Sequence, residues 1–101
     1  LKVTYITDTV YFDGLSRFAE NSDLLICEGM YGDDEYIPKM TEKGHMVFSQ
    51  AARTARDSNS KELWLTHFSP ALKFPEEQLG SARQIYSNVT AGRDCLKRCI
   101  N

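Results

Sequence analysis

Two acidic residues and one histidine each stand directly after a run of strand-forming residues. Asp8 follows KVTYIT, Glu28 follows LLIC and His67 follows LWLT. In α/β sheets, ligands bind beyond the carboxyl ends of the strands. A carboxylate and an imidazole at neighbouring strand ends can share one metal ion, and both are good zinc ligands. The pattern indicates a metal site, although simple turn caps would explain Asp8 and His67 equally well.

Alternating strand and helix patterns have to position these side chains. Strands are predicted for residues 2–7, within 23–29 and for 61–67, because these runs are rich in β-branched, aromatic and aliphatic residues. The clearest helix is predicted for residues 46–57, where four apolar residues share one face: Phe48, Ala51, Ala52 and Ala55.

The weaker patterns complete the same alternation. Short helices are predicted for residues 14–20, with Asp13 as a cap, and from Pro75 onward, and a last strand within 89–100. Residues 30–44 are polar and interrupted by Gly and Pro, so they are predicted to form a loop with at most one helical turn near its end. The order β-α-β-α-β-α-(β) is typical of an α/β layered domain.

Length and composition narrow the class of protein. The 101 residues suffice for one domain, and no apolar run approaches the ~20 residues that a membrane span needs. A net charge of −2 gives no general attraction to nucleic acid, so binding a polyanion would require a local basic patch or a metal. Leu1 opens directly on a strand pattern, which leads us to expect a piece of a longer protein.

The cysteines favour a reducing compartment. Three are present, an odd number without a secretion signal, which indicates free thiols and a cytoplasmic location. Cys95 and Cys99 have a spacing that a metal pair could use. We favour the interpretation that Cys95 and Cys99 bind no metal, because the chain has no second cysteine pair to complete a four-cysteine site and neither histidine lies near them in the sequence.

Four sequence blocks point to a family. YITDT, SDLLICEGMY, EKGHMVFSQAA and LTHFSP occur in this order. Together they resemble the C-terminal half of ribonuclease Z, a tRNA 3′-processing endonuclease of the metallo-β-lactamase superfamily, over about residues 2 to 90. The resemblance implies an α/β fold that is one half of a metallo-β-lactamase αββα sandwich, with residues 1–101 as the C-terminal half of a hydrolase domain.

The resemblance also implies roles for particular residues. Asp8 matches the aspartate that bridges two zinc ions, and His67 matches the last metal ligand, with manganese as an alternative metal. Glu28 and His45 match a catalytic pair in which the carboxylate orients the imidazole, so that its other nitrogen can carry a proton to the leaving oxygen. Ser69 is a candidate for binding substrate phosphate, or equally for stabilising the turn before Pro70.

Several features of the family are missing. The superfamily's H-x-H-x-D-H block, which supplies most zinc ligands, has no counterpart among the two histidines of this chain. The chain alone is therefore expected to be inactive, and the missing N-terminal half is its first expected partner. Pro70–Leu72 occupy a stretch where an arginine is common in the family, and Val47 stands where a threonine is usual.

Three functions remain open from the sequence. The favoured one is a zinc-dependent phosphodiesterase whose partner is precursor tRNA. The second keeps the fold but takes a small phosphodiester or another ester as substrate. The third is a non-catalytic α/β binding module that binds no metal. A second copy of the chain, forming a homodimer, is another partner that the sequence leaves open. No membrane association is expected.

Overall fold

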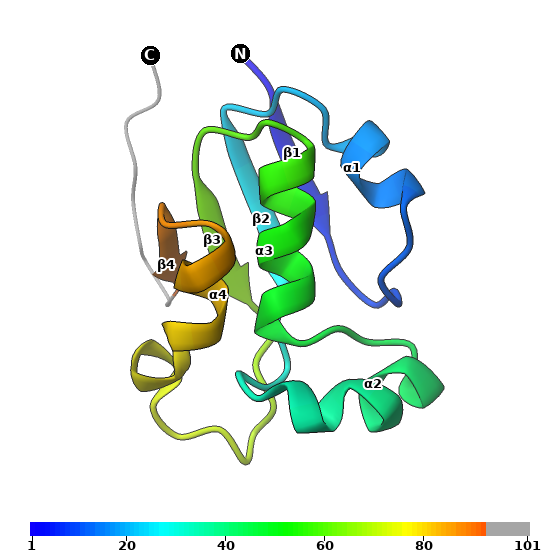
Figure 1. The fold of residues 1–101 in the computed structure, drawn as a ribbon, viewed down its shortest axis with the longest axis vertical. Coiled ribbons are helices and arrows are strands. Elements are labelled where there is room, and N and C mark those ends of the chain that lie inside the picture. The colour runs from blue at the N-terminus through cyan, green and yellow to red at the C-terminus, as the bar shows by residue number, and fades with distance from the viewer. Residues whose placement is uncertain (93–101) are drawn as a thin grey trace.

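Four parallel strands form the sheet of the computed structural model, which describes residues 1–92 (Figure 1). The strands are β1 (Val3–Ile6), β2 (Leu24–Glu28), β3 (Leu63–Thr66) and β4 (Val89–Ala91), and they lie side by side in sequence order. Because all four run the same way, their carboxyl ends meet at one edge of the sheet. The predicted α/β class is confirmed.

Helices make the connections between the strands. They are α1 (Gly14–Phe18), α2 (Ile37–Lys43), α3 (Phe48–Asp57) and α4 (Gly80–Ile85), with short 3₁₀ turns η1 (Asp34–Tyr36) and η2 (Pro75–Gln78). None of the helices in residues 1–92 is long and apolar enough to cross a membrane.

The main core lies between α3 and one face of the sheet. The predicted stripe of α3 is fully buried, as are the facing side chains of β2 and β3. Figure 1 shows α3 in front of the sheet, running roughly along the direction of the strands. The buried residues of this layer include Phe48, Ala51, Ala52, Ala55, Leu25, Cys27, Leu63 and Leu65. This packing fixes the carboxyl ends of the strands relative to the start of α3.

The opposite face of the sheet is more open. Val3 and Tyr5 of β1 are 53% and 58% exposed, and their register partners on β2 are Leu24 and Ile26. Ile26 in turn pairs with Trp64 of β3, and both side chains are partly exposed. An apolar strip thus runs across this face from β1 to β3.

The helical turn predicted near the end of residues 30–44 is present but longer than predicted, because α2 spans most of the second half of this segment. Asp33 begins the helical region, since its carboxylate accepts a hydrogen bond from the Glu35 backbone N–H. Pro38 lies in the first turn of α2, where proline is tolerated, and Gly44 ends the helix in a left-handed conformation with φ of 79°.

The structure also tests the predictions made for Asp13 and for the last strand. Asp13 precedes α1 as predicted, but its side chain makes no capping hydrogen bond. The predicted last strand is present as β4, although only its first part, because residues 93–101 and with them Cys95 and Cys99 lie outside the described residues. Cys27 is a buried free thiol, and burial raises its pKa well above the usual range.

Candidate metal centre

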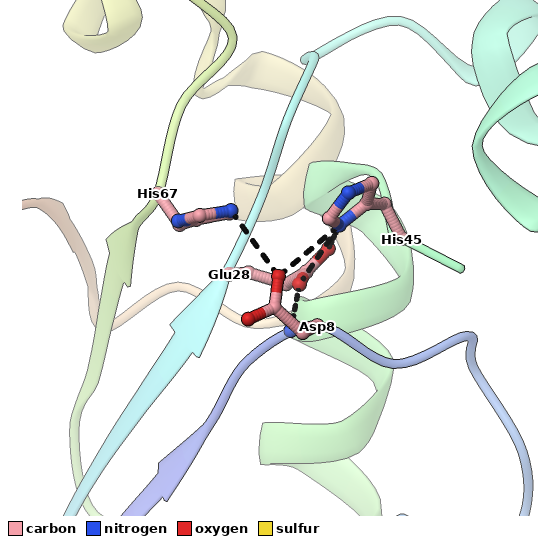
Figure 2. A group of neighbouring side chains, drawn as sticks. All are labelled: Asp8, Glu28, His45 and His67. Atoms are coloured by element: carbon pink, nitrogen blue, oxygen red, sulfur yellow. Dashed lines mark hydrogen bonds and ion pairs between the residues drawn. The ribbon is translucent and has the colours of Figure 1, made fainter. Parts of the chain in front are cut away.

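Four side chains converge at the carboxyl edge of the sheet (Figure 2). Asp8, Glu28 and His67 follow or end β1, β2 and β3, and His45 lies between α2 and α3. Each offers one donor atom, and these atoms all lie within 4.8 Å of one another. The parallel sheet therefore brings together residues that are far apart in the sequence.

Glu28 is the buried hub of this group. Its side chain is fully buried, and it accepts hydrogen bonds from the backbone N–H groups of Asp8 and Met46. His45 Nδ1 lies 3.1 Å from Glu28 Oε2 and 3.2 Å from Oε1. Since an ionised carboxylate can only accept, Nδ1 must donate its proton here, which leaves Nε2 as the nitrogen available to a ligand.

Asp8 and His67 form the accessible part of the group. Their side chains are 67% and 44% exposed, and Asp8 Oδ1 lies 3.4 Å from His67 Nε2. Both residues have a left-handed backbone, with φ of 56° and 58°. This conformation is uncommon for residues other than glycine and is enriched at functional sites. It turns the chain sharply where each strand ends.

Backbone hydrogen bonds tie the loops of the site together. The loop after β2 is central: Gly29 N–H donates to Thr66 O at 2.9 Å, and Met30 N–H donates to Met46 O at 2.9 Å. Ser69 N–H in turn donates to Met30 O at 3.0 Å. The segment after Glu28 thus holds the loop of His67 on one side and the loop of His45 on the other.

Ser69 is buried two residues beyond His67, and its hydroxyl already has partners. It donates to the phenol oxygen of Tyr31 at 2.8 Å and accepts a hydrogen bond from Ala71 N–H at 3.2 Å. These contacts are those of a turn-stabilising residue, and a role toward substrate stays a prediction. No pattern in the sequence connects Tyr31 to this loop, because Tyr31 and Ser69 are 38 positions apart.

The donor set fits a divalent metal of the zinc type. A tetrahedral ion with bonds of about 2.0–2.1 Å holds two of its donors about 3.3 Å apart. The Asp8 and His67 donor atoms, at 3.4 Å, have this spacing. Glu28 is fully engaged by N–H donors, so its position suits an orienting role rather than ligation. Two ligands are few for tight binding, and further donors would have to come from outside the described residues.

Comparisons with known proteins agree on one fold family. Residues 1–68 match the family described as "Beta-lactamase superfamily domain". Among curated relatives, the chain is 50% identical over 101 residues to "Ribonuclease Z" of Clostridium acetobutylicum and 45% identical over 101 residues to that of Clostridium kluyveri. In each case the match covers 100% of this chain but only 33% of the relative, so the chain spans about a third of the relatives' length.

Solved structures give the same result. The metallo-β-lactamase fold protein YhfI from Bacillus subtilis superposes with a TM-score of 0.74 at 33% identity, covering 86% of this chain and 35% of that one. Human tRNase Z, short form, superposes with a TM-score of 0.65 at 31% identity, covering 88% of this chain and 29% of that one. The expected resemblance to ribonuclease Z is confirmed.

Proposed function

The chain belongs to the β-lactamase superfamily, and from that premise we propose that it is part of a ribonuclease Z-like phosphodiesterase that processes the 3′ ends of precursor tRNA in the cytoplasm. The proposal depends most on one observation. Asp8, Glu28, His45 and His67 gather in one group, in a chain that is 50% identical to a ribonuclease Z.

In this proposal Asp8 and His67 hold zinc. Zinc, when bound, polarises a phosphoryl oxygen and lowers the pKa of bound water, which is the chemistry that phosphodiester hydrolysis needs. The exposure of both side chains supports the assignment, because a substrate phosphate has to reach the same place. If two zinc ions were bound, the negative charge of the Asp8 carboxylate would offset the repulsion between them.

Glu28 and His45 supply the proton chemistry. Glu28 fixes the ring of His45 through Nδ1, so Nε2 is directed away from the buried hub. With a proton on each ring nitrogen, His45 donates the Nε2 proton to the oxygen of the departing RNA strand and keeps the Nδ1 proton in its hydrogen bond to Glu28. Because His45 is only 21% exposed and its ring centroid lies 5.6 Å from that of His67, the proton is held next to the metal ligands.

We place residues 1–101 in the C-terminal half of a hydrolase domain, with the rest of the protein covering the exposed face of the sheet. Two facts support this arrangement. The chain spans about a third of its curated relatives, and the apolar strip on β1 and β3 lies partly open to solvent. The other half also supplies the remaining metal ligands in this proposal.

Precursor tRNA cleavage by the whole protein tests the function directly. We expect activity that requires zinc or manganese, and a loss of at least about a hundredfold in kcat/KM for Asp8→Ala and for His67→Ala. Bound zinc, measured by atomic absorption, should fall in the same two variants. Cleavage and zinc content equal to those of the unaltered protein in both variants would rule out the assignment.

A small phosphodiester substrate is the second candidate. It is favoured by Pro70–Leu72, a stretch without arginine after His67. Comparing kcat/KM for precursor tRNA with that for bis(p-nitrophenyl) phosphate separates the two. A preference for tRNA of several orders of magnitude supports the first candidate, and equal or lower efficiency on tRNA supports the second.

A further inference from the structure

We propose that a hollow beside the metal centre binds one nucleobase of the RNA strand, next to the phosphate that is cleaved. The hollow lies between the segment 31–36 and the loop that follows His67, and its volume is about 320 Å³. The inference rests on the proposed function for its choice of RNA, while the site itself is defined by the side chains that line it.

Two stacked tyrosines form one wall of the hollow. The rings of Tyr31 and Tyr36 lie nearly parallel, with centroids 4.1 Å apart and 11° between their planes. Ala71 and Leu72 line it as well, and both tyrosines are only partly exposed. A flat base can extend such a stack, since every base has an aromatic face and aromatic side chains bind single strands in this way.

The hollow lies close to the metal-binding group. Tyr31 is three residues beyond Glu28, and its hydroxyl accepts a hydrogen bond of 2.8 Å from Ser69. Ser69 is two residues beyond His67, a separation of at most about 7 Å along the chain. A nucleotide adjacent to a phosphate on Asp8 and His67 can therefore place its base against the tyrosines.

The charge of the lining selects the base over the phosphate. Asp33 and Glu35 line the hollow, and none of its lining residues within the described chain is Lys or Arg. Carboxylates repel a phosphate but accept hydrogen bonds from amino groups. The subsite should therefore prefer bases that carry an exocyclic amino group, which are adenine, cytosine and guanine, over uracil.

Tyr36 is the better residue to change, because the Tyr31 hydroxyl also holds Ser69. Tyr36→Leu removes the aromatic face and keeps apolar bulk, and Tyr36→Phe is its matched control. The probe is a short single-stranded RNA with 2-aminopurine beside the cleavage position and a non-hydrolysable linkage at that position, bound to the whole protein with its metal in place. We expect strong quenching of the probe in the unaltered protein and in Tyr36→Phe. For Tyr36→Leu we expect weaker quenching and an affinity lower by about tenfold or more.

A second arm needs no substitution. RNAs that differ only at the probed position, with adenine, uracil or no base, are compared for binding to the unaltered protein. Adenine should bind several-fold better than uracil, and the abasic strand worst. Equal binding of all three, or equal binding by Tyr36→Leu and Tyr36→Phe, would overturn the subsite.

The two proposals fail in different ways. Cleavage that needs Asp8 and His67, together with binding that ignores Tyr36, would overturn the subsite and leave the function standing. Binding that depends on Tyr36, in a protein that cleaves no RNA, would support the subsite and overturn the function.

Discussion

The Glu28 carboxyl group has no exposure to water, and the hydrogen bonds around it compensate for its burial. Two backbone N–H groups and one imidazole N–H point at its two oxygens. Bonds of this kind to an ionised group are stronger than those between neutral partners. Removing the carboxylate would leave these donors buried without acceptors, a loss of about 1–3 kcal/mol for each. Glu28 is thus a structural centre of the site, in addition to the orienting role that the proposed function gives it.

His45 offers a cleaner test of the proton step than Glu28, because it is partly exposed and changes less of the packing. In the whole protein, His45→Ala should lower kcat/KM on RNA by about 10²–10⁴-fold, the usual contribution of a general acid. A p-nitrophenyl phosphodiester releases a stable anion that needs no proton, so its rate should fall far less. Steady-state kinetics on both substrates check this.

Asp8→Ala is the control for this comparison, since losing a metal ligand should reduce both rates alike. If His45→Ala also reduced both rates to the same extent, His45 would not be the proton donor. In that case the ratio of the RNA rate to the p-nitrophenyl rate would equal that of the unaltered protein, which would indicate that His45 binds the phosphate.

At the scale of elements, the sequence was most informative where periodicity was strong. The apolar stripe of residues 48–55 predicted α3, and the runs of strand-forming residues predicted the sheet. The polar residues at the ends of these runs predicted the edge of the sheet where the site lies. The full length of α2 was missed, because its inward-facing residues are few and only Met40 is buried. Two of its start and stop signals, Pro38 and Gly44, were present but were interpreted as interruptions of a loop.

The site could be predicted only in part. Asp8 and His67 follow from their positions at strand ends, but His45 came from the family resemblance alone. No pattern in the sequence connects it to Glu28, because their contact depends on how α2 and α3 are joined. The Tyr31–Tyr36 stack was missed for the same reason, since the turn between them had been interpreted as an irregular loop.

Gly29 keeps the site edge packed against the core. A Cβ at this position would lie 2.6 Å from a ring carbon of Phe48 and 3.3 Å from Leu65 Cδ2. Both neighbours are fully buried, so they have little room to move. We expect Gly29→Ala to lower the free energy of unfolding of the whole protein by about 1–3 kcal/mol, the usual cost of overpacking. Urea unfolding measures it.

Gly80→Ala is the matched control for Gly29→Ala. Gly80 begins α4, and a Cβ there would meet nothing within 4 Å. This change should be neutral or stabilising by up to about 1 kcal/mol, because alanine has less freedom than glycine in the unfolded chain. Equal effects of the two substitutions would show that the contact with Phe48 is relieved at no cost.

Within residues 1–92, the sheet has one well-covered face and one that is only partly covered. The second face carries Val3, Tyr5, Ile26 and Trp64, and contiguous apolar surface of this kind usually meets a partner. We therefore expect another layer of the protein to pack against this face of residues 1–92. That layer would also bring the ligands that Asp8 and His67 lack.

The 101-residue chain produced alone tests this view. It should cleave no phosphodiester, bind a hydrophobic dye and associate at higher concentration, because the open strip finds other copies. Sedimentation at several concentrations and a cleavage assay with zinc measure these properties, with the whole protein as the comparison. A stable, active monomer of 101 residues would contradict both the missing-ligand argument and the proposed division of the domain.

The sheet is ordered from β1 to β4 just as the chain is, so each new strand is added to an edge that already exists. During synthesis, the part of the protein described here can thus be assembled in the order in which it leaves the ribosome. Asp8, Glu28 and His45 are all made before His67. In the proposed function, Asp8 and His67 can share a metal only after the third strand has joined the sheet, so the contribution of this chain to the metal site would follow the growth of the sheet.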